Sequence, residues 1–169
     1  MTKFRFETSI GTLTIRFGKE GIRSLSLPDR VETAAYENDK PDFLEGWDNA
    51  VSAVNKLIDY FNGAAVDFSS IKLDLGEYSD FFRTVSEEVG SIPYGTVSTY
   101  GRVAENIGKN GAARAVGRVM AGNPIPIIIP CHRVVAADGT LTGYSAAGGL
   151  EMKKYLLRLE KSEYFLKSI

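Results

Sequence analysis

The two side chains best suited to nucleophilic chemistry stand next to each other. Cys131 is the only cysteine and His132 the only histidine among 169 residues. A thiol attacks as its thiolate, and a neighbouring imidazole is the usual means of forming a thiolate near neutral pH. The pair therefore predicts a cysteine nucleophile served by a histidine base. A buried structural cysteine is the alternative, and the adjacent histidine favours chemistry over it.

The segment before this pair is apolar and stiff. Pro124, Pro126 and Pro130 each fix φ and lack a backbone donor, so the segment cannot be a helix or a central strand. The three isoleucines at 127–129 predict a short buried strand or extended piece. Such a lead-in would hold the sulfur in one place.

The composition is that of a globular protein with a hydrophobic core. Hydrophobic residues make up 44% of the chain, and its length suits one ordinary domain or two small ones. No run approaches the roughly 18–20 apolar residues of a membrane helix. The first residues show no apolar signal region, which argues against secretion. One cysteine excludes an internal disulfide, and one cysteine with one histidine cannot supply the usual ligands of a zinc site.

Charge is distributed unevenly along the chain. The net charge is only −1, but residues 1–90 carry 10 Lys and Arg against 16 Asp and Glu. Residues 91–150 carry 5 against 2, and residues 151–169 carry 5 against 3. A basic C-terminal half fits contact with an anion such as DNA. Ordinary solvated charge is the plainer explanation.

The N-terminal half predicts a small sheet covered by a helix. Period-two alternation in residues 3–7, 12–17 and 22–27, separated by turn residues, predicts a three-stranded antiparallel meander. Residues 43–61 carry one apolar stripe and predict an amphipathic helix. Residues 66–75 are expected to be extended and to add to the sheet.

The C-terminal half predicts a succession of helices. Residues 79–89, 99–107, 111–121 and 150–160 show helical patterns, the second with Ser98 as its expected N-cap. The spacing of the two middle helices is that of a helix-turn-helix.

A domain boundary is predicted at Gly76. The fold class is α/β, with an N-terminal α/β domain at residues 1–76 and a mostly helical C-terminal domain at residues 77–169.

The helix predicted at residues 111–121 has an unusual second face. Ala113, Gly117 and Ala121 lie on it together with Arg114 and Arg118. Small residues flanked by arginines let a helix backbone approach a negatively charged partner closely. Gly117 in mid-helix costs roughly 1 kcal/mol against alanine, and nucleic-acid contact would explain it. Close packing against another helix explains it equally well.

Three motifs resemble the O6-alkylguanine-DNA alkyltransferase family. They are the run Pro130-Cys131-His132-Arg133-Val134, the run from Ala112 to Gly117 ahead of Asn123-Pro124, and the run from Lys153 to Glu160. The resemblance covers roughly residues 78–160. Residues 1–75 are similar to the family in the order of elements rather than in motif.

The resemblance implies a fold and a function. It implies an RNase H-like N-terminal domain and a winged-helix-like C-terminal domain. The implied activity is DNA repair by irreversible transfer of an alkyl group from O6-alkylguanine to the protein's own cysteine, without turnover; activity on O4-alkylthymine is left open. The implied partner is double-stranded DNA, bound through its minor groove by a monomer without a cofactor, a metal or a membrane. The implied location is the cytoplasm of a prokaryote or the nucleus of a eukaryote.

The resemblance also implies roles for five catalytic residues. Cys131 would accept the alkyl group. His132 would draw the thiol proton through a bound water, and Glu160 would hold His132 in the needed tautomer. Tyr100 would donate to N3 of the extruded guanine, and Asn123 would pin the turn that presents the thiol.

A second set of residues would bind the DNA or the base. Arg114 would fill the gap left by the flipped nucleotide, and the carbonyls of Cys131 and Val134 would accept from the guanine amine. The loop with Tyr144 and Ser145 would cover the base, with the backbone N–H of Ser145 near O6. The full set implied to bind DNA or base is Arg114, Ala113, Gly117, Arg118, Val134, Tyr144 and Ser145.

The sequence departs from the family pattern in one loop. Residues 144–150 are about two residues longer than the compact loop expected there. This places the role of Ser145 in question and could widen the pocket.

Three other functions are compatible with parts of the sequence. A thiol hydrolase takes its histidine from far along the chain rather than from the next residue. Alkyltransferase-like proteins bind the lesion but carry another residue at the position of Cys131. A transcriptional helix-turn-helix would bind a specific operator sequence. The adjacent Cys131 and His132 favour the alkyltransferase over all three.

Overall fold

The computed structural model describes residues 1–28 and 46–166. The chain forms two compact units, Met1–Leu75 and Gly76–Ile169. The division falls one residue before the predicted one. Positions 43–45 of the first predicted helix lie outside the described residues.

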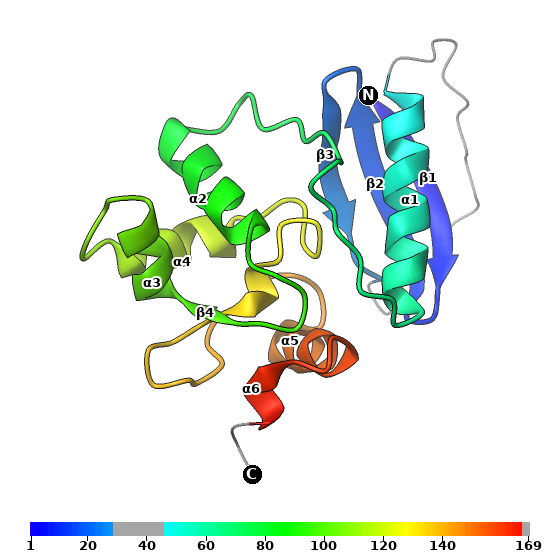
Figure 1. The fold of residues 1–169 in the computed structure, drawn as a ribbon. Coiled ribbons are helices and arrows are strands. Elements are labelled where there is room, and N and C mark those ends of the chain that lie inside the picture. The colour runs from blue at the N-terminus through cyan, green and yellow to red at the C-terminus, as the bar shows by residue number, and fades with distance from the viewer. Residues whose placement is uncertain (29–45, 167–169) are drawn as a thin grey trace. The chain divides into compact units, whose positions relative to one another are not determined.

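The first unit is built on the predicted antiparallel meander. Strands β1 (Thr2–Thr8), β2 (Gly11–Gly18) and β3 (Gly21–Ser26) pair in sequence order (Figure 1). Alternation places Leu13 and Ile15 of β2 at 0% exposure, as expected for a sheet with one buried face. The prediction of a small three-stranded sheet is therefore confirmed.

Helix α1 (Trp47–Phe61) covers one face of this sheet (Figure 1). Its apolar stripe is buried, with Ala53, Leu57 and Tyr60 at 0% exposure. The helix begins after Gly46, which has a positive φ of 82°. A Cβ at this position would overlap the Gly18 carbonyl oxygen, so only glycine fits there.

The segment after α1 does not become a full strand. Only Leu73 makes a bridge to β3, through Ile22. Ile22 donates to the Lys72 carbonyl at 2.9 Å, and Asp74 donates back to the Ile22 carbonyl at 2.8 Å. The prediction that residues 66–75 extend the sheet is thus right only at this bridge.

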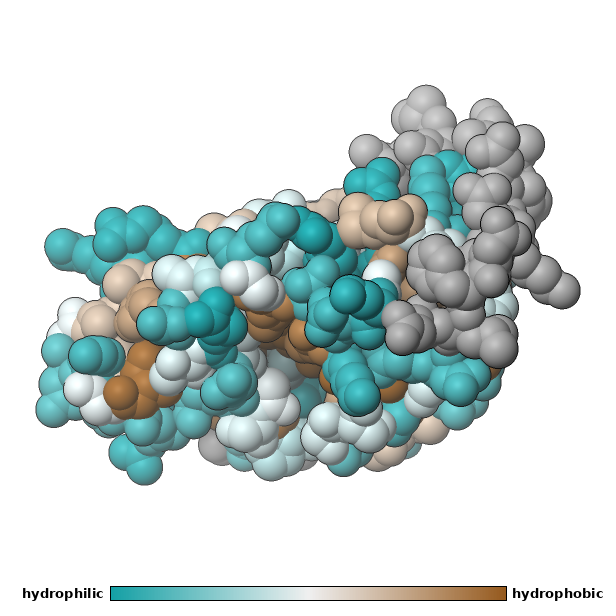
Figure 2. Space-filling view, turned by 90° about the horizontal axis from the view of Figure 1, so that it is seen from above, coloured by the Kyte–Doolittle hydropathy of each residue, from teal (hydrophilic) through white to brown (hydrophobic). Residues whose placement is uncertain are grey.

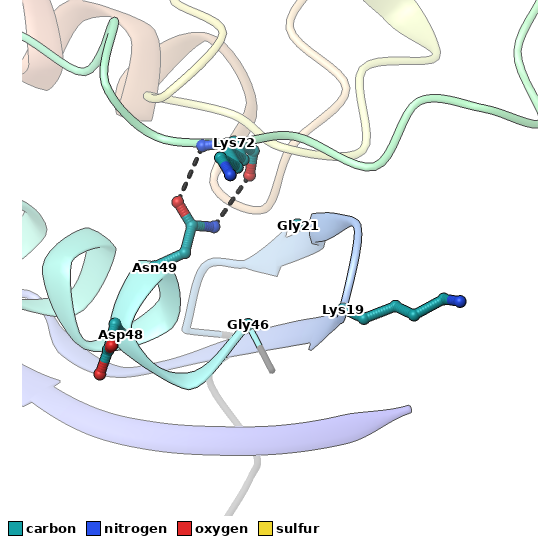
Figure 3. Close-up of a pocket in the computed structure, with 6 residues that line it drawn as sticks. All are labelled: Lys19, Gly21, Gly46, Asp48, Asn49 and Lys72. Carbon is teal, nitrogen blue, oxygen red and sulfur yellow. Dashed lines mark hydrogen bonds between the residues drawn. The ribbon is translucent and has the colours of Figure 1, made fainter. Parts of the chain in front are cut away.

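A shallow pocket of about 290 Å³ opens within the first unit (Figure 3). The lining residues are Lys19, Gly21, Gly46, Asp48, Asn49 and Lys72. The Asn49 side chain accepts from the Lys72 N–H at 2.8 Å and donates to the Lys72 carbonyl at 3.0 Å. No candidate catalytic residue belongs to this group.

The second unit is mostly helical. The elements in order are α2 (Asp80–Gly90), β4 (Ser98–Thr99), α3 (Tyr100–Asn106), α4 (Ala113–Ala121), the 3-10 helix η1 (Cys131–Arg133), β5 (Val134–Val135), α5 (Gly149–Leu159) and α6 (Glu163–Leu166). Each predicted helix is present, with ends shifted by one or two residues.

One N-cap differs from the prediction. The hydroxyl that accepts from the Arg102 N–H belongs to Thr99, and not to Ser98. Ser98 and Thr99 are instead strand β4, because they pair in parallel with Val134 and Val135. This short pairing joins the start of α3 to the end of η1, and so brings Tyr100 near Cys131.

Helices α3 and α4 pack against each other as the predicted helix-turn-helix (Figure 1). Figure 2 shows one face of the molecule, on which most of the coloured residues are hydrophilic and hydrophobic residues are visible between them. Within residues 1–28 and 46–166, no helix combines the length and the apolar character needed to cross a membrane.

Candidate active site

A tight turn leads into the cysteine. The Asn123 side chain donates to the Ile129 carbonyl at 2.9 Å and accepts from the Ile125 N–H at 3.0 Å. Ile127 within the turn has a positive φ of 75°, which is strained for a β-branched residue. The predicted strand or extended piece is therefore wrong. A turn forms because the Asn123 amide bonds both to its start and to its end.

Cys131 begins η1 and is 6% exposed. Burial raises the pKa of its thiol, and three weaker influences oppose this rise. They are a hydrogen bond from Asn123, the charge of Lys153, and the backbone N–H groups of residues 131 and 132. Desolvation is the largest of these influences, so the resting thiol is protonated and needs a base such as His132 to become a thiolate. The opposing groups nevertheless form a cradle that would stabilise a thiolate once formed.

His132 is fully buried against a carboxylate. Its Nε2 lies 2.7 Å from Oε1 of Glu160, and both side chains are 0% exposed. Burial lowers the pKa of His132, and Glu160 offsets part of this fall. Burial alone would raise the pKa of Glu160, but His132 and Arg133 hold it at about 2. Glu160 is therefore ionised, so the neutral imidazole must carry its proton on Nε2, which leaves Nδ1 as the basic nitrogen.

Arg133 completes this buried group. Its Nε and Nη2 both lie 3.0 Å from Glu160, and its Nη1 donates to the Ile92 carbonyl at 2.6 Å. The guanidinium also lies over the Tyr94 ring, 5.9 Å from its centroid. At 5% exposure, Arg133 is an internal ion-pair partner and cannot reach a phosphate.

Tyr100 and a buried lysine converge on one carbonyl. The Tyr100 hydroxyl donates to the Thr142 carbonyl at 3.3 Å, and Lys153 Nζ donates to the same oxygen at 3.2 Å. Lys153 also donates to the Val134 carbonyl at 2.7 Å. Burial raises the pKa of Tyr100, so its hydroxyl keeps the proton it would donate.

Sequence reasoning missed Lys153. Its side chain is 0% exposed, and burial lowers its pKa to about 8, against the opposing influence of Cys131. The available signal was its place on α5, three and four residues before the buried Leu156 and Leu157. A lysine on the apolar stripe of a helix is expected to be buried and to pair with polar groups inside the protein.

The small-residue face of α4 is accessible. Arg114 and Arg118 are exposed, whereas Ala113 and Gly117 are half-buried. A Cβ at Gly117 would lie 3.9 Å from the Tyr100 ring, an ordinary contact distance. Packing within the described part of the chain therefore does not require glycine at this position.

The loop after β5 carries the last two predicted residues. The Ser145 hydroxyl donates to the Ala121 carbonyl at the end of α4, at 2.5 Å. Burial raises the pKa of Tyr144 well above its usual value, and the charge of Cys131 adds to this rise. The Tyr144 hydroxyl is buried without a hydrogen-bond partner among the described residues, while the Ser145 side chain is tied to α4.

Within residues 1–28 and 46–166, no three His, Cys, Asp or Glu side chains group so that they could hold an ion.

The chain is similar to known proteins over almost all of its length. A family model described as "6-O-methylguanine DNA methyltransferase, DNA binding domain" matches residues 80–162. A methylated-DNA–protein-cysteine methyltransferase of Mycolicibacterium paratuberculosis is 41% identical over 155 residues, which is 92% of this chain and 89% of that one. One of Methanosarcina acetivorans is 39% identical, over 93% of this chain and 96% of that one.

A solved structure agrees with these relatives. The crystal structure of Mycobacterium tuberculosis OGT in complex with DNA superposes with a TM-score of 0.75 and 37% identity, covering 95% of this chain and 93% of that one. The fold and the site thus define a DNA-binding protein with a buried cysteine next to a buried histidine–glutamate pair. The chain belongs to the methylated-DNA–protein-cysteine methyltransferase family.

Proposed function

We propose that this protein repairs DNA by moving an alkyl group from O6-alkylguanine onto Cys131, once per molecule. The observation that carries the proposal is the Cys131 cradle beside the buried His132–Glu160–Arg133 group. The relatives' names state the same transfer to a protein cysteine from methylated DNA.

The reaction balances with the groups present. The thiol proton passes to Nδ1 of His132 through a bound water, and the resulting imidazolium is stabilised by Glu160. The Cys131 sulfur forms a bond to the alkyl carbon, and the carbon–O6 bond breaks. Its electron pair stays on the guanine, which recovers one proton.

The base reaches the sulfur by leaving the helix. An O6-alkyl group is inaccessible inside a duplex, so the nucleotide must rotate out, at a cost of a few kcal/mol. We propose that α4 lies in the minor groove, where Gly117 and Ala113 permit close approach and Arg118 meets phosphate. Arg114, exposed on the same helix, would fill the gap in the stack.

The pocket would read the guanine through three groups. Tyr100 would donate to N3 as negative charge develops on the ring, after releasing the Thr142 carbonyl. The carbonyls of Cys131 and Val134 would accept from the exocyclic amine. A carbonyl has two lone pairs, so Val134 can serve the base while it accepts from Lys153.

Further parts of the proposal follow from the family. The same step would act on O4-alkylthymine, which also carries its alkyl group on an exocyclic oxygen. The protein would act as a monomer where the genome lies, in prokaryotic cytoplasm or a eukaryotic nucleus. The RNase H-like and winged-helix-like descriptions of the two units stay predictions.

The rate of transfer should depend on pH in a specific way. With DNA saturating, we expect a nearly level rate from about pH 6.5 to about pH 8, because the thiol and the imidazole are then both neutral and the proton moves between them. The rate should fall in acid as His132 gains a proton, and in alkali as Lys153 loses the charge that favours the thiolate. The pH dependence of the transfer rate is measured by single-turnover kinetics across this range.

A variant of Lys153 tests the cause of the fall in rate above pH 8. In Lys153→Met the fall above pH 8 should disappear, together with part of the rate. A rate that rises about tenfold per pH unit throughout would instead indicate that the Cys131 thiol loses its proton to solvent. This result would contradict a reaction that starts from a neutral thiol and a neutral imidazole.

The end point tests the proposed function. A thioether is a poor leaving group, and the chain has no second cysteine or histidine to remove it. With excess duplex containing O6-methylguanine, methyl transfer should stop at one group per protein molecule, as measured by intact mass. Continued turnover, or turnover on a peptide or ester, would favour a thiol hydrolase.

A further inference from the structure

The Tyr144 hydroxyl is a buried polar group with no hydrogen-bond partner among the described residues. Buried hydroxyls in folded proteins are nearly always paired, and an exception calls for an explanation. A ligand that arrives with an acceptor is one such explanation.

The loop that carries Tyr144 is anchored on both sides. Two residues earlier, the Thr142 carbonyl accepts from both Lys153 and Tyr100, at 3.2 and 3.3 Å. One residue later, the Ser145 hydroxyl donates to the Ala121 carbonyl at 2.5 Å. The position of Tyr144 is therefore set by the fold before any substrate arrives.

Hydrogen bonds tie the loop of Tyr144 to the site of the nucleophile: Thr142 accepts from Tyr100 and Lys153, and Lys153 also donates to the Val134 carbonyl, three residues after Cys131. Burial is the larger cause of the raised pKa of Tyr144, and the charge of Cys131 is the other. The phenol thus stays protonated and can only gain by donating. In the attack, the alkyl carbon lies between the sulfur and O6, so O6 must come close to the groups that surround the sulfur.

We propose that the Tyr144 hydroxyl donates a hydrogen bond to O6 of the alkylated guanine and strengthens it as the carbon–O6 bond breaks. This rests on the proposed function. As the sulfur–carbon bond forms, the electron pair of the broken bond moves to O6 and the ring, and the hydroxyl meets that charge without giving up its proton. Tyr144 then acts at O6 while Tyr100 acts at N3, two donors on one leaving group.

The proposal also accounts for the longer loop. The family resemblance places the backbone N–H of Ser145 near O6, but its side chain is committed to α4. The added residues let the preceding tyrosine present its side chain to O6.

The test is Tyr144→Phe, with Tyr155→Phe as its matched control. Tyr155 lies on α5 at 37% exposure, so its variant should behave as the unaltered protein. With saturating duplex containing O6-methylguanine, Tyr144→Phe should slow single-turnover transfer roughly 100-fold, the usual effect of removing one such donor. Its affinity for the duplex should change less than about twofold, because the bond forms mainly in the transition state.

Two further readouts separate a catalytic role from a structural one. The melting temperature of free Tyr144→Phe should equal or exceed that of the unaltered protein, since the lost hydroxyl had no partner to lose. On a duplex with 6-methylthioguanine, whose sulfur is a weak acceptor, the rate difference between variant and unaltered protein should shrink.

The inference is overturned if Tyr144→Phe reacts as fast as the unaltered protein, or if its melting temperature falls by several degrees. An equal rate loss on both duplexes would also overturn it. A failure of the unaltered protein to take up any methyl group would instead refute the proposed function.

Discussion

Cys131→Ala will lose all methyl transfer and keep its affinity for DNA. The sulfur supplies the electron pair that forms the new bond, and no second cysteine can replace it. The surfaces proposed to bind DNA lie on α4, where Arg114 and Arg118 are exposed, and the substitution leaves them untouched. Duplex affinity should therefore stay within about threefold, a change below ~0.7 kcal/mol.

The measurement pairs two assays on one sample. Transfer is followed by intact mass, and binding by fluorescence anisotropy with a labelled duplex containing O6-methylguanine. Cys131→Ser is a useful companion, because its hydroxyl keeps the shape and remains protonated at neutral pH. Residual methylation in either variant would contradict a single acceptor.

Glu160→Gln should be the most damaging conservative substitution in the chain. Glu160 accepts from four donors: His132 Nε2, the Nε and Nη2 of Arg133, and the Gly95 N–H at 3.1 Å. A neutral amide leaves the Arg133 charge buried without its counter-ion, which typically costs about 3–5 kcal/mol. The melting temperature should fall by roughly 10 °C.

Activity should fall further than stability. Without the carboxylate, His132 loses the partner that fixes its tautomer and balances its positive charge after it takes the proton. A loss of roughly 10³- to 10⁴-fold is the usual effect of removing such a group. Single-turnover rates measured at temperatures below the melting transition of Glu160→Gln separate the loss of activity from unfolding.

Glu151→Gln is the matched control. Glu151 lies on the same helix, and its carboxylate pairs with Lys154 at 2.7 Å on the surface, with its side chain 79% exposed. Such a change usually alters stability by less than about 0.5 kcal/mol. Equal losses in both variants would contradict the role given to the buried carboxylate.

The pH dependence of stability should differ between the unaltered protein and Glu160→Gln, as measured by thermal melting between about pH 2 and pH 7. The pKa of Glu160 is held at about 2, below its ordinary 4.5. Its stabilising contribution is therefore present above pH 4.5 and is lost as the pH falls toward 2. The unaltered protein should lose this contribution in acid, whereas Glu160→Gln has none to lose.

The sequence predicted the elements that local pattern controls. Period-two alternation predicted the three strands, and the stripe ending at Phe61 predicted α1. The uniqueness of Cys131 and His132 identified the centre of the site. In each case the signal lies in a few neighbouring residues, which is where sequence patterns are informative.

The remaining features depend on contacts between distant residues. Ser98 was expected to cap a helix, but Val134 draws it into a strand pair. The isoleucines before Cys131 turn back on themselves because Asn123 bonds across them. The protonated resting thiol follows from burial, and burial cannot be read from the pair itself. Lys153 acquires its role from two carbonyls far from it in sequence.

The most direct test follows the methyl group from the DNA to the protein. A duplex containing O6-methylguanine with a deuterated methyl group is mixed with the protein, and the protein is digested and its peptides weighed. The account predicts that the peptide holding Cys131 gains one deuterated methyl group per molecule and that all other peptides are unchanged. No gain on that peptide, or the label on any other residue, would contradict it.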